Sequence, residues 1–592
     1  MISYLINMQR ISRLLIVFIF LATACAEESK KVVQNDQNES FDTFKEEFLL
    51  NIWKQYPGWA SWAGLHQYDS ILNINSPENR AKFIGTLEEI NSKLNTFQLN
   101  NLDDSNKIDY YLIENFIASE RWNSNTFKSY EWNASNYNIA GRAWTIINGT
   151  YADLDTRLKI LSSFLSKASS YYQFGINNLK NPTMEHLELG LVQNKGALGI
   201  LNEGLLDSIS KSNLGENDKD ILKLRVDTTK EAITNYISAL ENLKLKFANG
   251  GAKSSRIGKE LFYKKYELDI NANYTAGEIY KKALKEKEVL HQQMITISDT
   301  LWKKYLVNIE KPEDKISMVK MLIDKIAEKH VSREDFFKEI NRQIPILYAF
   351  VKEKDLLTQD PEKPLVVRET PHYMRGGGSG ASVSSPGPYE KGKDTYYNVT
   401  PLDDYTEEEA ESYLREYNHY ILQILNIHEA IPGHYTQLVY SNESPSVIKS
   451  ILGNGAMIEG WANYAETMML EQGYNNSPEM WLMRHKWHLR GVTNTILDYS
   501  YHVLNIDKEE GMGLMIKDAF QEKTEAENKW RRVTLSSVQL SSYFTGFSQI
   551  YELRDEIKAI EGNDFNLKKF HEQFLSYGNA PVRHIRDLMI NE

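Results

Sequence analysis

Residues 275–294 read TAGEIYKKALKEKEVLHQQM, and this stretch predicts a long amphipathic helix. Thr275 and Glu278 have the spacing of a capping box, in which each side chain accepts a hydrogen bond from the other residue's backbone N–H. Apolar residues then return every three or four positions, the period of one helix face. A second capping box, Thr406 with Glu409, precedes the run AESYLREYNHYILQIL and predicts another helix there.

The helical period continues from Phe41 onward, with few glycines and prolines, so we expect a mainly α fold. Residues 364–369 and 395–400 are rich in β-branched and aromatic side chains and predict two short strands. The glycine-rich segment 374–389 between them is expected to be a flexible flap beside an active site, the alternative being an ordinary surface loop. The linker around residues 250–251 separates an N-terminal helical region, 41–250, from a C-terminal one, 251–592. We expect these regions to form two walls of one cleft.

The first 24 residues have the features of a signal peptide. Arg10 and Arg13 border the apolar run LLIVFIFLATA, residues 14–24, which is short for a membrane span and suits secretion. The run ends at Cys25, the only cysteine, in a context that resembles a bacterial lipobox. We therefore predict lipid attachment at Cys25, a polar tether over residues 25–40, and a place in the bacterial cell envelope, either periplasmic or at the surface. The alternatives are an ordinary signal peptide and a short buried helix.

Composition excludes some partners. The formal net charge is -12, whereas binding to nucleic acid phosphates requires a basic face. Past the N-terminus there is no run of about 20 apolar residues that could span a bilayer.

The histidines point to a metal site. Six of the 13 lie within one stretch of the chain, which includes His428-Glu-Ala-Ile-Pro-Gly-His434. Zinc peptidases often carry two histidines four apart on a helix, with a glutamate beside them as general base. Here the spacing is six residues, which would place the two side chains roughly 120° apart on a straight helix. Pro432 and Gly433 predict a broken turn that brings His434 back toward His428.

A second predicted helix, beginning near Gly455, supplies a candidate third ligand. Glu459 and Glu466 are seven residues apart and share one face of this helix. Because Glu459 lies among apolar residues, its carboxylate needs a partner. Two imidazoles and one carboxylate leave a fourth position for water, as hydrolytic zinc requires. We predict Glu459 as a ligand and Glu466 as a carboxylate that orients a histidine; the alternative is that both are solvated charges.

These segments resemble a known family. HEAIPGH followed by EGWANYAE at 459–466 is similar to the bacterial family catalogued as domain of unknown function 885, whose members look like zinc metallopeptidases. Further landmarks are RIGKELF at 256–262, TPHYMRGG at 370–377, YYNVTPL at 396–402 and YFTGFSQIYELR at 543–554. The 25-residue step from His434 to Glu459 is also similar to that of the thimet-type oligopeptidases, which are helical clamshells with a deep channel.

The resemblance implies a large helical clamshell with a small β element beside the active site. It also implies that His428, His434 and Glu459 bind Zn²⁺, that Glu429 is the base, and that Tyr543 points into the cleft.

Other residues are candidates for the surroundings of the metal. Tyr543 or His502 could donate a hydrogen bond to the reaction intermediate. Asp498 stands four residues before His502 and either holds its imidazole or forms a surface contact. Arg554 either binds a substrate carboxylate or is structural. The strand that contains Tyr397 is expected to pair with an extended peptide.

The sequence therefore predicts an exported zinc metallopeptidase that acts on peptides and is attached to the membrane through its N-terminal lipid. Two alternatives stay open. One is a zinc hydrolase that cuts a non-peptide amide or ester, since its ligands and base would be the same. The other is a non-catalytic lipoprotein that binds nutrients, a class that has no need of Glu429 beside paired histidines.

Overall fold

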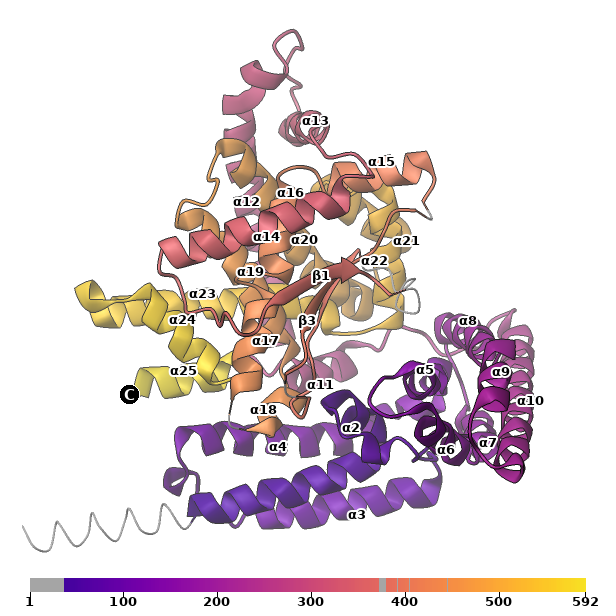
Figure 1. Cartoon of the computed structure of the whole chain (residues 1–592). Helices are drawn as coiled ribbons and strands as arrows, with labels where there is room; N and C mark the ends of the chain where they lie inside the picture. Colours follow the sequence, from indigo (N-terminus) through magenta and orange to yellow (C-terminus); the bar gives the residue numbers. More distant parts are fainter. Residues whose placement is uncertain (1–36, 372–379, 391, 404, 445, 592) are drawn as a thin grey trace, which may run out of the picture.

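The computed structural model describes residues 37–371, 380–390, 392–403, 405–444 and 446–591. These residues form helices and one small sheet, so the predicted mainly α class is confirmed (Figure 1). Within this part of the chain, no helix combines the length and apolar character needed to cross a membrane. The predicted signal peptide and Cys25 fall outside the described residues. The last residues of the predicted tether, 37–40, already belong to a helix.

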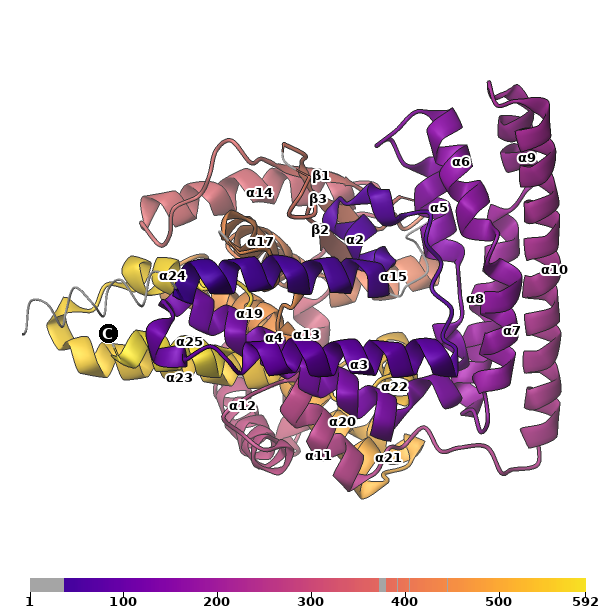
Figure 2. The same cartoon turned by 90° about the horizontal axis from the view of Figure 1, so that it is seen from below.

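The N-terminal helices lie along one side of the molecule (Figure 2). They are residues 37–55, α2 (Pro57–Ala63), α3 (Pro77–Leu94) and α4 (Asp104–Trp122). Ser76 and Asp103 cap α3 and α4 by accepting hydrogen bonds from backbone N–H groups of the first turn. Their apolar faces, with Phe41 and Ile113 fully buried, join the same hydrophobic core as the C-terminal half of the chain.

The next six helices form a separate lobe, at the lower right of Figure 1. They are α5 (Ala140–Asn148), α6 (Leu154–Leu165), α7 (Ala168–Asn178), α8 (Met184–Ile200), α9 (Glu203–Lys211) and α10 (Glu216–Phe247). This lobe has its own core, in which Tyr172 donates a hydrogen bond to Asn194 at 3.0 Å. Because the first helices share the other core, packing does not divide the chain at residue 250. The predicted domain division itself stays a prediction.

The remaining elements form the body of the molecule. Before the sheet come α11 (Lys259–Asp269), α12 (Ala276–Tyr305), α13 (Lys315–Ile326) and α14 (Phe336–Glu353). After it come α15 (Glu407–Glu416), α16 (Ile421–Glu429), α17 (His434–Glu443), α18 (Val447–Ile451), α19 (Gly455–Glu471), α20 (Pro478–Tyr499), α21 (Lys508–Gly513), α22 (Lys523–Leu535), α23 (Ser542–Glu561), α24 (Leu567–Ser576) and α25 (Val582–Asn591).

Both predicted capping boxes are present, at the starts of α12 and α15. The helix predicted over the run AESYLREYNHYILQIL is, however, interrupted between α15 and α16. There Asn418 turns its side-chain oxygen to the backbone N–H groups of Tyr420 and Ile421. An asparagine side chain that bonds nearby backbone groups in this way competes with the helical hydrogen-bond pattern. The chain therefore leaves the helix after Glu416 and begins a new helix, α16, at Ile421.

The sheet has the strand order β1-β3-β2, with β1 Leu365–Glu369, β2 Ala381–Ser384 and β3 Thr395–Val399. Both predicted strands exist, while β2 lies within the segment expected to be a flap; residues 372–379 of that segment are outside the described part. Since β3 pairs with both neighbours, its edges are occupied and the predicted pairing with a peptide is wrong. Tyr397 is fully buried, and its hydroxyl donates to Asn426 at 2.8 Å, beneath α16.

Two glycines bring α19 and α23 together. A Cβ atom on Gly460 would collide with the backbone of Gly546, and one on Gly546 would collide with the carbonyl of Ala456. Only glycine allows two helix backbones to approach this closely. This contact carries Tyr543, three residues before Gly546, to the face of α19 that holds Glu459.

Candidate metal site

The chain between the two histidines is broken as the proline and glycine predict. Helix α16 ends at Glu429 and α17 begins at His434. Gly433 donates its backbone N–H to the carbonyl of Ile427 at 3.0 Å. A Cβ atom at this position would collide with the carbonyl of His428, so the turn requires glycine.

A tryptophan from α19 fixes this turn in place. The indole N–H of Trp461 donates to the carbonyl of Pro432 at 2.8 Å, and the ring is fully buried. Trp461 lies two residues after Glu459 on the same helix. The contact therefore sets the position of the turn between His428 and His434 relative to Glu459.

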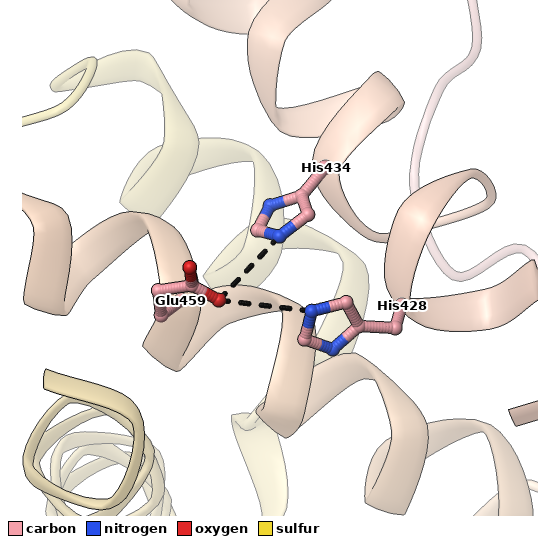
Figure 3. Close-up of side chains that lie close together, drawn as sticks. All are labelled: His428, His434 and Glu459. Atoms are coloured by element: carbon pink, nitrogen blue, oxygen red, sulfur yellow. Dashed lines mark ion pairs between the residues drawn. The ribbon is translucent and has the colours of Figure 1, made fainter. Parts of the chain in front are cut away.

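His428, His434 and Glu459 turn toward one another from three different helices (Figure 3). The Oε2 atom of Glu459 lies 3.7 Å from Nε2 of His428 and 3.6 Å from Nε2 of His434. The two imidazole rings are nearly perpendicular, with centroids 4.7 Å apart. One potential ligand atom from each residue lies within 4.8 Å of the others.

These separations fit a shared metal ion better than direct hydrogen bonds. Hydrogen bonds between these atom types are about 2.7–3.2 Å long, whereas two ligands of a tetrahedral zinc ion, each at about 2.0–2.2 Å, are roughly 3.3–3.6 Å apart. Glu459 Oε2 is buried, and none of the described residues gives it a hydrogen-bond partner. A divalent cation would satisfy this orphaned oxygen together with both imidazoles.

Glu466 contacts the ring nitrogen of His428 that does not face Glu459. Its Oε1 atom lies 2.7 Å from Nδ1 of His428, which leaves Nε2 directed at Glu459. Glu466 is fully buried and is held in turn by the indole N–H of Trp487 at 3.1 Å and by Nε of Arg484 at 3.2 Å. A carboxylate on the far nitrogen of a histidine ligand sets its tautomer and ring orientation.

The electrostatics of the site concentrate negative charge. Burial lowers the pKa of His428, but Glu459 and Glu466 more than offset this and raise it to about 10. Burial raises the pKa of the Glu429 carboxyl above its ordinary value, although both histidines oppose the shift. A raised pKa suits a group that must accept and then return a proton near neutral pH. His428 would have to lose this proton to hold a divalent cation, since imidazole must be neutral to act as a ligand.

Comparison with known proteins identifies the family. The model of the family described as "Bacterial protein of unknown function (DUF885)" matches residues 57–589. The chain belongs to the DUF885 family. The predicted membership of this family is thereby confirmed.

Two solved structures share the fold of this DUF885 chain. A candidate lipoprotein of unknown function from Shewanella oneidensis is 48% identical, with a TM-score of 0.87 over 93% of this chain and 99% of that one. A candidate lipoprotein from Colwellia psychrerythraea, 18% identical, has a TM-score of 0.75 over 95% and 100% of the two chains, and shows the fold alone. Comparison with curated proteins gives no match.

Tyr543 stands beside the candidate metal site of the DUF885 chain. Burial and the charge of Glu459 raise the pKa of its hydroxyl to about 12, so the hydroxyl keeps its proton at neutral pH. Arg532 donates a hydrogen bond to the Tyr543 oxygen at 3.1 Å. The phenol can therefore donate its own proton to a bound molecule.

His502 does not have the predicted role. Its Nε2 donates to the carbonyl of Ser536 at 2.9 Å, and its Nδ1 lies 3.5 Å from the backbone N–H of Ile257. The side chain is 1% exposed, and burial lowers its pKa to about 4. Both ring nitrogens thus contact backbone groups, and neither is available to a substrate.

Asp498 also forms hydrogen bonds with the backbone. Its carboxylate accepts hydrogen bonds from the N–H groups of Val538 and Ser541, both at 3.1 Å, and from the Ser541 hydroxyl at 2.9 Å. It lies 3.7 Å from Nε2 of His502, too far for the predicted hydrogen bond. Its place is structural: it holds the turn that precedes α23.

Arg554 is committed to an ion pair. Its Nη1 atom donates to Glu471 at 2.7 Å, and its guanidinium lies over the ring of Tyr551 at 4.0 Å. Glu471 ends α19, twelve residues after Glu459 and so about 18 Å along the helix axis. Of the two interpretations of Arg554, the structure supports the structural one.

Three residues of the site were missed from the sequence: Trp461, Arg484 and Trp487. The last two are three residues apart in WLMRHKWHLR, residues 481–490, and this spacing places them on one helix face. The histidines of the same segment are the more obvious signal. The available clue was an arginine directly after three apolar residues, because a buried guanidinium requires a carboxylate.

Proposed function

We propose that this DUF885 protein is a zinc-dependent metallopeptidase that hydrolyses peptide bonds. The observation that carries the proposal is the convergence of His428, His434 and Glu459 on one point, with Glu466 behind the first histidine. Two histidines and a carboxylate, with a position left open, are the ligand set of hydrolytic zinc sites.

Glu429 is the proposed general base. Zinc bound to the three ligands would act as a Lewis acid and lower the pKa of water toward about 7. Glu429 directly follows His428 in sequence, and its raised pKa fits a carboxylate that takes a proton from water and passes it to the leaving amine.

Tyr543 is the proposed hydrogen-bond donor on the other side of the reacting carbonyl. It is half-buried, close enough to Glu459 for that charge to raise its pKa, and protonated at neutral pH. A donor placed in advance stabilises the negative charge that develops on the carbonyl oxygen.

The proposed place of action is the outer side of a bacterial membrane. The two related structures are described as candidate lipoproteins, and Cys25 is the single cysteine, directly after an apolar segment. We infer that a lipid on Cys25 attaches the enzyme to the cell envelope.

The first experiment compares metal content and hydrolysis of a mixed peptide library by the wild-type protein and by Glu429→Gln. We expect about one zinc per chain in both, with peptide cleavage in the variant reduced by about 10²–10⁴-fold. Bound zinc without cleavage of any peptide would instead indicate an amide or ester substrate of another class. A wild-type protein that binds no metal would refute the proposal.

A further inference from the structure

A group of charged side chains borders the proposed catalytic tyrosine. Glu525, Lys529 and Arg532 recur at intervals of four and three along α22 and so share one helix face. Arg490 of α20 meets them there and donates a hydrogen bond from Nη2 to Glu525. We call these four residues the cationic cluster.

The cationic cluster contains more positive than negative charge. Glu525 is its only carboxylate among three cationic side chains, and those three cations hold its pKa below the ordinary value despite burial. The nearby Lys486 does not alter this balance, because it is paired with Glu416 at 2.7 Å. With all groups ionised, the formal charge of the cluster is therefore about +2, from three cations and one anion.

Two donors of the cluster have no hydrogen-bond acceptor among the described residues. Nη1 of Arg490 is buried and has no hydrogen-bond partner among the described residues. Lys529 is 5% exposed, and its nearest acid, Glu525, lies 3.7 Å away, beyond hydrogen-bond reach; none of the described residues offers it a closer acceptor. Leaving a buried charged donor such as Arg490 Nη1 unsatisfied is costly, so such a donor usually indicates a missing partner.

The state of Lys529 supports the same view. Burial, together with Arg490, lowers its pKa to about 7, because nearby positive charge and loss of solvent both penalise the ammonium form. A bound anion would reverse this effect and supply the missing acceptor for charge-assisted hydrogen bonds.

The cluster is joined to the proposed catalytic residues on two sides. Arg532 contacts the Tyr543 hydroxyl at 3.1 Å. The Arg490 guanidinium lies over the Trp487 ring at 4.7 Å, and the same indole donates to Glu466, the carboxylate behind His428. Arg490 and Glu525 remain 18% and 24% exposed, so a molecule from solvent can reach them.

We propose that the cationic cluster binds a carboxylate of the substrate, with Lys529 and Arg490 as the two donors. This inference rests on the proposed peptidase function and narrows its substrate class to peptides that carry a negative charge near the bond to be cut. The carboxylate has two possible sources, the C-terminus of the peptide and an acidic side chain.

The test uses pairs of peptides that differ by one charge. The zinc-loaded wild-type protein is given each peptide as the free C-terminal acid and as the C-terminal amide, and amidated peptides with Glu or Gln at each position. We expect kcat/KM to be about 10–100-fold higher for the charged member of one kind of pair, the range expected for a lost charge-assisted hydrogen bond. Preference for the free acid identifies the C-terminus, and preference for Glu identifies a side chain.

Lys529→Met removes one donor at nearly constant side-chain volume. We expect it to reduce the ratio between charged and uncharged peptides about tenfold, chiefly through KM, with zinc content and thermal midpoint retained. Lys523→Met is the matched control, because Lys523 is exposed on the same helix outside the cluster; its ratio should equal that of the wild type.

Equilibrium binding of the same peptide pairs to zinc-loaded Glu429→Gln separates this inference from the proposed function. Cleavage and binding that are equal for charged and uncharged peptides would overturn the carboxylate site while the peptidase assignment stands. Tighter binding of the charged peptide, weakened in the double variant with Lys529→Met, would support the site even if the wild type cuts no peptide. The comparison of acid with amide on the wild type needs no folded variant.

Discussion

Two histidine–carboxylate groups of this protein look alike by distance and differ in their surroundings. In the candidate metal site, Glu459 lies 3.7 Å and 3.6 Å from Nε2 of His428 and His434. Between α20 and α23, Asp498 lies 3.7 Å from Nε2 of His502. The separations are nearly equal, and all three histidines are largely shielded from solvent.

The difference lies in what else the nitrogens contact. Nε2 of His428 and Nε2 of His434 face one carboxylate oxygen that has no hydrogen bond to any described residue, whereas both ring nitrogens of His502 meet backbone groups. A metal ligand needs a free lone pair aimed at a point that other ligands share. The comparison teaches that convergence of unused lone pairs distinguishes a metal site, while proximity of histidine to acid does not.

The largest difference in zinc content and activity should appear when one histidine of each group is replaced in turn. His434→Gln should lose stoichiometric zinc and at least about 10³-fold in kcat/KM, because loss of the metal removes several kcal/mol of stabilisation of the transition state. His502→Gln should keep zinc and stay within a few-fold of wild-type activity. Zinc content and cleavage rates of both variants, measured side by side, test this. Loss of zinc from His502→Gln alone would reverse the comparison.

A smaller effect on catalysis is expected when Tyr543 is replaced, and Tyr397 provides the matched comparison. Tyr543→Phe should lower kcat by about 10²–10³-fold with zinc retained, the usual result of removing a donor that stabilises developing charge. Tyr397→Phe, which loses the hydrogen bond to Asn426, should instead cost about 1 kcal/mol of stability and leave kcat within a few-fold. Equal losses of kcat in the two variants would exclude a special role for Tyr543.

Removing the negative charge of Glu466, which contacts Nδ1 of His428, should have a more moderate effect on zinc binding. Glu466→Gln should reduce zinc affinity by about 10–100-fold, because His428 loses the carboxylate that sets its tautomer. Glu471→Gln, at the end of the same helix and paired with Arg554, is the control and should bind zinc as the wild type does. Competition with a metal-buffering chelator gives both affinities, and equal values would contradict the role of Glu466.

The smallest effect on activity, and the clearest on stability, concerns acid. Burial lowers the pKa of His502 from 6.5 to about 4, so below pH 6.5 the unfolded chain takes up a proton that the folded chain refuses. His502 therefore costs nothing above pH 6.5 and destabilises the protein progressively down to pH 4, by at most about 3 kcal/mol. Denaturant unfolding at several pH values should show a weaker loss on acidification for His502→Gln than for wild type. Parallel curves would mean that His502 is not buried as neutral imidazole.

Local patterns predicted much of the fold. The capping boxes at Thr275 and Thr406, the helix that carries Glu459 and two of the three strands follow from short-range interactions, which neighbouring residues largely decide. The break at Asn418 and the strand Ala381–Ser384 were missed, since one depends on a side chain that bonds its own backbone and the other on pairing with a distant strand.

The candidate site was predicted in part. His428, His434, Glu459 and Glu466 were singled out by residue type and spacing, and the structure brings them together. His502, Asp498 and Tyr397 were placed wrongly because sequence spacing does not tell which group of the folded chain a polar side chain will bond. His502 and Asp498 bond backbone groups, and Tyr397 bonds the side chain of Asn426. Arg554 was left open for the same reason, as its partner Glu471 is 83 residues away in sequence.

By itself, the sequence determined the helical class, the turn that Pro432 and Gly433 impose, and the set of residue types able to bind zinc, because these depend on backbone preferences and side-chain chemistry. Only the tertiary structure decided which lone pairs stay free and where they meet. The contact between Gly460 and Gly546 and the bond from Trp461 to Pro432 set the relative positions of α16, α19 and α23. Convergence of atoms from separate helices follows from how those helices pack, and no spacing along the chain contains that information.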